Sequence, residues 1–343
     1  MRMTARRMTA SLVLAMLIAA AAWAARPAPE PRTNLRIVAM RYLSFAPIFI
    51  ALDEGFFEQE GLDVEFYAVS RSDAAIPPLI QGDVDVVPAA IMPSYFNVIQ
   101  RGATMKVVAG KGHHAPNACP YSGIMVSRKL LESGTFSSVA DARGLVVSID
   151  RSSPSYFRLD RFLEMGGLTL DDMRIIDIPG PTRLDAFDNG ALHITTVSEP
   201  WISLFRRAGH AELWMESRKL MPGFQFGHLL FGKSLLEERP EDGEKFMRAY
   251  LRAVRQLNRD GSSPRNIEIL AKYTRLDEAL LAEACWPTIR NDGRVQTEDL
   301  LAFQHWALEE GLISQIMPSE QVYDPRFVES ANRTLDATKS QQP

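Results

Sequence analysis

The first part of the chain alternates between two patterns of apolar side chains. Leu35–Met40 (LRIVAM) and Leu62–Val69 (LDVEFYAV) place apolar or branched residues at every second position, as a half-buried strand does. Between them, residues 46–57 (APIFIALDEGFF) carry apolar residues at the three- and four-residue spacing of a helix. Gly55 lies near the end of that helix, and Gly61 marks a turn. The pattern predicts a β-α-β crossover whose second strand packs beside the first.

The same alternation then repeats. Strand-like segments at 84–90 and 105–110 follow helical segments at 72–83 and 93–102. We expect the helix at 72–83 to be broken by Pro77–Pro78. Strands linked by helices in this order form a parallel sheet that helices cover on both faces. The N-terminal part of the chain therefore predicts one α/β lobe.

A second α/β lobe follows, with strands at 145–150, 174–179 and 192–197 separated by helical segments. Two further strand-like segments flank this lobe, at Ser122–Ser127 and Phe226–Gly232. We interpret them as hinge strands. The expected order is lobe 1 (first part, 35–121), hinge (122–127), lobe 2 (128–225), hinge (226–232) and a helical second part of lobe 1 (233–343).

The N-terminus has the pattern of a cleavable signal peptide. Arg2, Arg6 and Arg7 precede the apolar run Ala10–Ala24, whose last three residues have the small-x-small form that signal peptidase cleaves. We therefore expect residues 1–24 to be removed and a flexible proline-rich lead-in at 25–34 to follow. The alternative is an uncleaved N-terminal anchor.

Charge and cysteine content narrow the function classes. The 343 residues carry 38 Lys+Arg and 42 Asp+Glu, so no basic excess suggests a nucleic-acid partner. Cys119 and Cys285 have no metal-binding or redox spacing. An exported protein can join them in a disulfide, but two buried free thiols fit the sequence equally well.

Motifs of enzymes and metal sites are missing from the sequence. It has no G-x-S-x-G elbow and no phosphate-binding G-x-x-x-x-G-K. Among six histidines only His113 and His114 are adjacent, and no Cys or acidic residue stands at ligand spacing from them. We therefore predict no catalytic residue, no metal and no cofactor.

Candidate ligand-binding residues follow the strands of the first lobe. Tyr42 and Phe45 come after the first strand, and Ser94 comes after the third. In open α/β sheets, ligands bind outside the carboxyl ends of the strands.

In the second lobe, a serine-rich helix start follows the first strand. Ser153 is a predicted N-cap and Pro154 a first helical residue, so backbone N–H groups gather beside Ser152, Ser155 and Tyr156. Such a site favours an anionic or carbonyl group, and plain helix capping is the alternative.

Glu199 and Trp201 follow the last strand of the second lobe. A carboxylate beside an indole suits a ligand with N–H donors on a flat ring. The alternative is that Glu199 is the N-cap or first-turn acid of the next helix.

Five segments, in this order and spacing, resemble the solute-binding proteins of ABC-type importers for sulfonates, taurine, nitrate, thiamine-precursor pyrimidines and related compounds. The segments are APIFIALDEGFFEQEGLDVEF, LIQGDVDVVPAA, RGATMKVVAG, SVADARGLVVSIDRSSPSYFRLDRFLEMGGL and FDNGALHITTVSEPW. The resemblance runs from Leu35 to Lys233. It implies a two-lobed α/β fold of the type II venus-flytrap kind, in which each lobe is a mostly parallel sheet flanked by helices and the C-terminal tail is helical.

The resemblance also implies a periplasmic monomer that holds a small molecule between its lobes and delivers it to an ABC permease. By position the family's pocket falls on Tyr42, Phe45, Ala89, Ser94, Ser152, Ser153, Ser155 and Glu199. Fungal enzymes of the same fold family use a cysteine-rich motif, but the comparable region here, NACPYSG, has only Cys119.

The ligand class is predicted from charge. Glu199, if it faces the cleft, repels a bare anion, whereas Tyr42, Phe45, Tyr156 and Trp201 offer rings for stacking. We therefore predict a small aromatic or nitrogen heterocycle, such as a thiamine-precursor pyrimidine. The alternatives are a sulfonate, taurine or nitrate ligand, an exported enzyme, or a ligand-sensing partner of a receptor.

Overall fold

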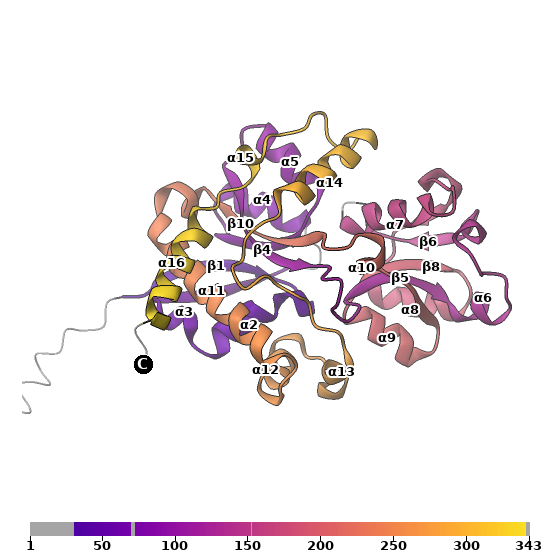
Figure 1. The fold of residues 1–343 in the computed structure, drawn as a ribbon, viewed down its shortest axis with the longest axis horizontal. Helices are drawn as coiled ribbons and strands as arrows, with labels where there is room; N and C mark the ends of the chain where they lie inside the picture. The colour runs from indigo at the N-terminus through magenta and orange to yellow at the C-terminus, as the bar shows by residue number, and fades with distance from the viewer. Residues whose placement is uncertain (1–30, 70–72, 152, 341–343) are drawn as a thin grey trace, which may run out of the picture. The chain divides into compact units, whose positions relative to one another are not determined.

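The computed structural model describes residues 31–69, 73–151 and 153–340 (Figure 1). The predicted signal peptide, most of the lead-in and Ser152 lie outside these residues. In the described part of the chain, no helix is both long and apolar enough to cross a membrane.

The sheet of the first lobe contains five strands in the order β2-β1-β3-β10-β4. β1 and β3 are parallel, and β10 is antiparallel to both β3 and β4. β1, β3 and β4 therefore run in one direction and β10 runs against them. The strands are β1 (Thr33–Ala39), β2 (Leu62–Ala68), β3 (Val86–Ala90), β4 (Met105–His113) and β10 (Gln225–Gly232).

The segment between β1 and β2 forms the crossover that the sequence predicts. It contains the helices α2 (Ala46–Asp53) and α3 (Phe56–Gln59). Gly55 lies between them with φ of 68°, a left-handed conformation that glycine adopts without the steric cost of a Cβ atom. The turn on Gly55 thus redirects the chain so that β2 can pair beside β1.

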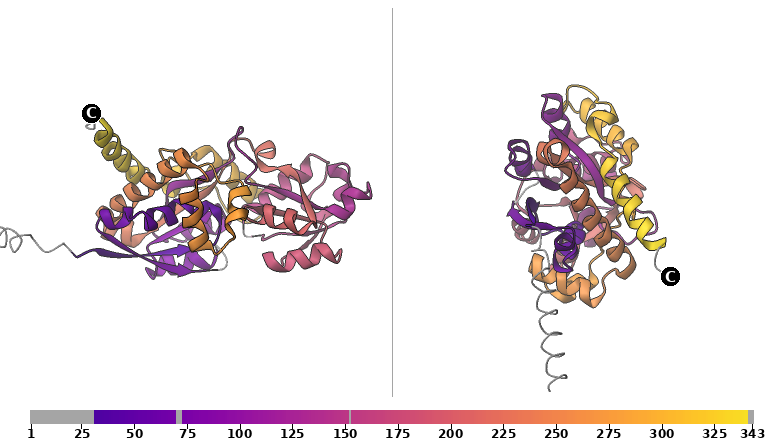
Figure 2. Two further views of the ribbon diagram at one scale, coloured as in Figure 1. Left: turned by 90° about the horizontal axis from the view of Figure 1, so that it is seen from below. Right: turned by 90° about the vertical axis from the view of Figure 1, so that its left-hand side faces the viewer.

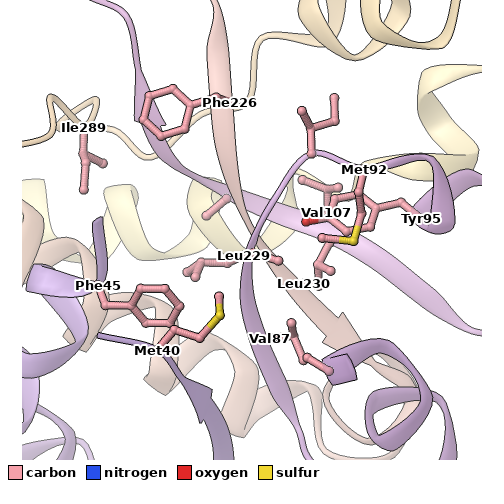
Figure 3. Packing of buried hydrophobic residues seen from close by; sticks show 14 of the residues in the cluster. Met40, Phe45, Val87, Met92, Tyr95, Val107, Phe226, Leu229, Leu230 and Ile289 are labelled. Atoms are coloured by element: carbon pink, nitrogen blue, oxygen red, sulfur yellow. The ribbon is translucent and has the colours of Figure 1, made fainter. Parts of the chain in front are cut away.

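The core of the first lobe lies on both faces of β10 (Figure 3). Leu229 points to the side of Phe45 and Met40, whereas Leu230 points to the side of Met92 and Tyr95. Both leucines are fully buried. A strand covered on both faces reads as a continuous apolar run, which explains the sequence LLF at Leu229–Phe231 in β10.

The second lobe has its own five-stranded sheet, in the order β7-β6-β8-β5-β9. β6 is parallel to β7 and β8, whereas β5 is antiparallel to β8 and β9. Both sheets are therefore mixed, with one inner strand reversed in each. The strands are β5 (Ser122–Ser127), β6 (Val146–Ser148), β7 (Arg174–Ile176), β8 (Ile194–Ser198) and β9 (Ala211–Glu216), and β9 was not predicted from the sequence.

The two hinge-strand candidates correspond to β5 and β10, and each is the reversed inner strand of one sheet. The chain passes from β4 to β5 through residues 114–121 and returns from β9 to β10 through residues 217–224.

Helices cover the sheets and form the C-terminal region. The long helix α11 packs against α2 and against the C-terminal helix α16, which lies beside it in yellow in Figures 1 and 2. The helices after α3 are α4 (Ile76–Gln81), α5 (Pro93–Gln100), α6 (Arg128–Glu132), α7 (Pro154–Glu164), α8 (Gly180–Asp188), α9 (Trp201–Ala208), α10 (Ser217–Leu220), α11 (Pro240–Asp260), α12 (Pro264–Thr274), α13 (Glu278–Glu283), α14 (Thr297–Glu309), α15 (Ser319–Val322) and α16 (Arg326–Ser340).

The prediction that Pro77–Pro78 breaks a helix is wrong. α4 begins at Ile76, and both prolines lie in its first turn. Backbone N–H groups in the first turn have no partner within the helix, so proline loses no hydrogen bond there.

Candidate functional site

The loops that follow β1 and β8 bring Tyr42 and Trp201 together. Trp201 lies within hydrogen-bonding reach of the Tyr42 hydroxyl, and Arg183 and Asp150 are the charged neighbours of that hydroxyl. Burial raises the pKa of Tyr42, and Arg183 and Trp201 oppose the rise. Two of the predicted ligand-binding residues, one from each lobe, are thus in contact.

The Trp201 indole packs closely on the start of α8. A Cβ atom placed on Gly180 would lie 2.5 Å from the indole ring, so only glycine fits beside the ring in this position. The indole also contacts Phe205, with ring centroids 6.0 Å apart. These contacts fix the orientation of the indole on the second lobe.

Glu199 precedes Pro200, the N-cap residue of α9, and is neither the N-cap nor a first-turn residue, but it accepts hydrogen bonds from Ser203 in the first turn. Its carboxylate accepts hydrogen bonds from the backbone N–H of Ser203 (3.1 Å) and from the Ser203 hydroxyl (3.0 Å). A third hydrogen bond, from the backbone N–H of Cys285 (3.4 Å), connects it to the C-terminal region. Glu199 is 3% exposed, and burial raises the pKa of its carboxyl while these hydrogen bonds oppose the rise.

The serine-rich helix start is capped as predicted. The hydroxyl of Ser153 accepts a hydrogen bond from the backbone N–H of Ser155 and donates one to the carbonyl of Asp150. Ser153 and Ser155 are half-buried. Tyr156 is buried, and its ring meets Trp306 of α14 edge-on. α7 of the second lobe therefore packs on a helix of the C-terminal region.

Phe45, Ala89 and Ser94 lie at the carboxyl ends of the first-lobe strands. Phe45 ends a short 3₁₀ turn after β1 and is 1% exposed. Ala89 is fully buried on β3 and pairs with His228 of β10. The hydroxyl of Ser94 is buried and has no hydrogen-bond partner among the described residues.

Sequence reasoning missed a buried lysine in the same region. Lys111 of β4 is 3% exposed, and its Nζ donates a hydrogen bond to Ser44 Oγ at 2.8 Å. The same ammonium group lies 4.3 Å from the centroid of the Phe45 ring. Burial lowers the pKa of Lys111 to about 7.

A β-bulge aims this lysine. Gly227 of β10 pairs with Gly112 and the next residue, His228, pairs with Gly110, so Lys111 is the extra residue of β4. A bulge bends the strand and redirects the side chain of the extra residue. A Cβ atom on Gly112 would lie 2.7 Å from the Phe226 ring, so β4 needs glycine at this position to lie against that ring.

A buried arginine from the second lobe was also missed. Arg158 of α7 is 2% exposed, and its Nη1 lies 3.4 Å from the hydroxyl of Thr196 on β8. Its Nε is buried without a hydrogen-bond partner among the described residues. Burial lowers the pKa of Arg158 to about 10, and nearby Tyr121 opposes the shift.

Tyr121 connects the neighbourhoods of the two cations. Its hydroxyl hydrogen-bonds with Ser44, the partner of Lys111, and the charges of Tyr42 and Glu199 also act on it. Its ring stacks on Phe226 with centroids 5.5 Å apart. Burial raises the pKa of Tyr121, so the hydroxyl keeps its proton at neutral pH.

Two histidines lie close to the cations. His228 is fully buried, both of its ring nitrogens have no partner among the described residues, and Lys111 is its charged neighbour. His114 stacks on Phe226 and has Arg158 as a charged neighbour. Burial lowers the pKa of both rings, to about 3 for His228, so both are neutral at pH 7.

Residues of the C-terminal region are fixed to the linker between the sheets by a disulfide. Cys119, in the segment from β4 to β5, bonds to Cys285, which follows α13. Of the two alternatives open in the sequence, the structure has the disulfide. Arg207 of α9 adds ion pairs to Asp277 (3.4 Å) and Glu283 (3.0 Å).

A small cavity lies beside this disulfide. It is lined by His113, His114, Tyr121 and Arg218 among others, and its volume is about 10 Å³, room for about one water molecule. An organic ligand needs more space, so it cannot occupy this cavity as it stands. Within the described part of the chain, no three His, Cys, Asp or Glu side chains are grouped as metal ligands.

Comparison with known proteins identifies a family and several relatives. Residues 28–274 match the NMT1-like family. A Brucella abortus (strain 2308) protein named as a binding protein is 23% identical over 235 residues, which cover 68% of each chain.

Solved structures share the fold. The periplasmic nitrate-binding protein NrtA from Synechocystis PCC 6803 superposes with a TM-score of 0.74 and 15% identity, covering 92% of each chain. The alkanesulfonate-binding protein SsuA from Xanthomonas axonopodis pv. citri, bound to MOPS, superposes with a TM-score of 0.68 and 17% identity. The match covers 87% of this chain and all of that one. The desulfurization enzyme DSZB superposes with a TM-score of 0.65 and 12% identity, and the match covers 88% of this chain and all of that one.

Two mixed sheets flanked by helices are the two-lobed fold of the periplasmic binding proteins of ABC importers. Together with the match over 28–274, this fold establishes that the chain belongs to the NMT1-like family.

Proposed function

We propose that this protein captures a small organic ligand between its two lobes and delivers it to an ABC-type permease. The observation that carries the proposal is the contact of Tyr42 with Trp201, because each follows the carboxyl end of a strand in a different sheet. A ligand that touches both loops binds the closed conformation more tightly and shifts the population toward it. The predicted hinge strands β5 and β10 would bend together with the connections at 114–121 and 217–224 that lead into them.

We propose that the ligand contains a flat ring. Tyr42 and Trp201 offer aromatic faces from the two lobes, and ring stacking on such faces favours an aromatic molecule or a nitrogen heterocycle. A thiamine-precursor pyrimidine is one member of this class. The repulsion of anions expected from Glu199 carries less weight, because that carboxylate is engaged by Ser203 and Cys285. Ring compounds with an acidic substituent therefore belong in the same screen.

The protein acts in the periplasm as a monomer in this proposal. Support comes from the leader pattern in the sequence and from the periplasmic proteins that share the fold.

A thermal-shift screen with small-angle scattering tests the binding function. The panel contains aminopyrimidines, aromatic acids, alkanesulfonates, taurine and nitrate. We expect at least one compound to raise the melting temperature by several degrees and to reduce the radius of gyration. A tight ligand that leaves the radius of gyration unchanged would contradict capture between the lobes.

An exported enzyme is the second candidate, because the desulfurization enzyme DSZB shares the fold. A test for conversion of the bound compound distinguishes a binding protein from an enzyme. The purified protein should return every stabilising compound of the panel unchanged after prolonged incubation, as measured by mass spectrometry. Conversion of a compound would favour the enzyme.

A further inference from the structure

Two cations are buried in the candidate site without an acidic partner. Lys111 is 3% exposed and Arg158 is 2% exposed. Among the residues that the structure describes, neither forms an ion pair with Asp or Glu. An isolated buried charge is costly, and proteins normally pair such groups or bind a counter-ion.

In the part of the chain that the structure describes, the surroundings of Lys111 supply no negative charge. Its Nζ has the Ser44 hydroxyl at 2.8 Å and the Phe45 ring at 4.3 Å. On β10, the neighbouring titratable group is His228, whose ring is neutral at pH 7. The bulge in β4 directs this side chain by adding one residue to the strand. A buried lysine that a bulge aims at a polar site is a binding group rather than a packing residue.

The surroundings of Arg158 are similar. Thr196 and Tyr121 are hydroxyl neighbours, and His114 is a neutral ring. The guanidinium has five N–H donors, and its Nε lacks a partner among the described residues. Arg158 therefore retains donors for an oxygen-bearing anion.

The two cations belong to one site. Ser44 accepts from Lys111 and hydrogen-bonds Tyr121, and Tyr121 in turn interacts with Arg158. Tyr42, which contacts Trp201, is also close to Tyr121. The charge of Glu199 acts on Tyr121, but Ser203 and Cys285 donate hydrogen bonds to its oxygens. Asp150 acts on Tyr42 but is not a charged neighbour of Lys111 or Arg158. The negative charge that these two cations lack must therefore come from outside the chain.

We propose that the captured ligand carries an anionic oxygen group, which Lys111 of the first lobe and Arg158 of the second lobe neutralise together. This inference rests on the proposed binding function and names the chemistry of its ligand. A carboxylate, a sulfonate and a phosphonate share the required chemistry, since each offers several charged acceptor oxygens to an ammonium and a guanidinium. The anionic group of the ligand connects the two lobes, because Lys111 belongs to the first lobe and Arg158 to the second.

The test uses matched ring compounds and isothermal calorimetry on the full-length mature protein. Benzoate, benzenesulfonate and phenylphosphonate are compared with benzamide, benzenesulfonamide and aminopyrimidine, and with nitrate and methanesulfonate as anions without a ring. The variants are Lys111→Met and Arg158→Met. The controls are Lys233→Met and Arg143→Met, whose side chains are 59% and 62% exposed.

We expect at least one anion to bind the wild-type protein at least 10-fold more tightly than its neutral counterpart. Lys111→Met and Arg158→Met should each weaken that binding at least 10-fold, and the control variants should change it less than 2-fold. Circular dichroism identifies a variant that fails to fold, and Lys111→Gln and Arg158→Gln then replace it.

Other outcomes overturn the proposal. Neutral compounds that bind as well as the anions, or anion binding that survives both substitutions, would show that the cations do not serve the ligand. Tight binding and compaction by a neutral compound alone would refute the anionic ligand and leave the binding function intact. The absence of binding by every compound, charged or neutral, would refute both.

Discussion

Glu199 Oε1 accepts a hydrogen bond at 3.4 Å from the backbone N–H of Cys285, 86 residues further along the chain. Since Cys285 is also bonded to Cys119, this one contact connects the loop after β8, the C-terminal region and the linker between the sheets. The loop after β8 is therefore held by residues far from it in sequence.

Replacing Glu199 should loosen this connection. Glu199→Ala leaves the N–H groups of Ser203 and Cys285 and the Ser203 hydroxyl without their acceptor, so we expect the free energy of unfolding to fall by about 1–3 kcal/mol. Urea denaturation at pH 7 measures the change. Glu212→Ala, at a half-exposed ion pair, is the control and should alter stability by less than about 1 kcal/mol. Equal effects of the two substitutions would contradict the connecting role of Glu199.

Removing the disulfide should lower the free energy of unfolding more than replacing Glu199 does. Cys119 and Cys285 are 166 residues apart, and the double variant with serine at both positions should lose about 2–5 kcal/mol of unfolding free energy. The measurement is denaturation with and without a reductant. Dithiothreitol should lower the stability of the wild-type protein and leave that of the variant unchanged. A wild-type protein that does not respond to the reductant under denaturing conditions would contradict a stabilising disulfide.

Replacing Lys111 should make the ligand-free protein more stable. A buried charge without a partner costs free energy, and replacing buried charges with apolar residues of similar size can stabilise by about 1–4 kcal/mol. We therefore expect Lys111→Met to unfold at higher urea concentration than the wild-type protein at pH 7. A less stable variant would mean that the contacts of the ammonium group with Ser44 and Phe45 outweigh the cost of burying its charge.

The same lysine predicts a pH dependence. Burial lowers the pKa of Lys111 from 10.5 to about 7 in the folded protein, so the unfolded chain binds the extra proton between these values. The wild-type protein should therefore lose stability, relative to Lys111→Met, as the pH falls from 10.5 toward 7. Ser44, Tyr121 and His228 lie around the group, and only Tyr121 and His228 titrate. Neither does so in this window when folded, because their pKa values are displaced above and below it.

Tyr42 and Trp201 should be energetically coupled. The single variants Tyr42→Phe and Trp201→Phe and the double variant form a thermodynamic cycle, and we expect a coupling energy of about 0.5–1.5 kcal/mol. Tyr67→Phe, an exposed tyrosine, should show no coupling to Trp201. A coupling energy of zero would mean that the two side chains do not interact in solution.

Much of the fold follows from local pattern. β5 matches its predicted bounds, and β1, β2 and β10 differ from theirs by one or two residues, because their apolar alternation is set by the faces they bury. β9 was missed. It is an edge strand whose sequence, AELWME, gains its partner only when β5 has been placed beside it.

The site was harder to predict. Ser153 was identified as a helix cap because capping depends on neighbours in sequence, and the structure has that cap. Lys111 and Arg158 were missed because lysine and arginine are mostly exposed, and their burial depends on contacts between distant segments. The lysine enclosed by glycines in AGKG was a usable signal, because such a strand end suggests a bulge.

The reversed strand β10 also has a consequence for synthesis on the ribosome. All five strands of the second sheet lie within residues 122–216, so this sheet can close soon after that stretch emerges. The first sheet begins to emerge earlier but lacks the strand between β3 and β4 until residue 232 has been made. The half-built first sheet therefore exposes two unpaired edges while the second sheet forms, and it is this interval in which a nascent chain would need protection by a chaperone.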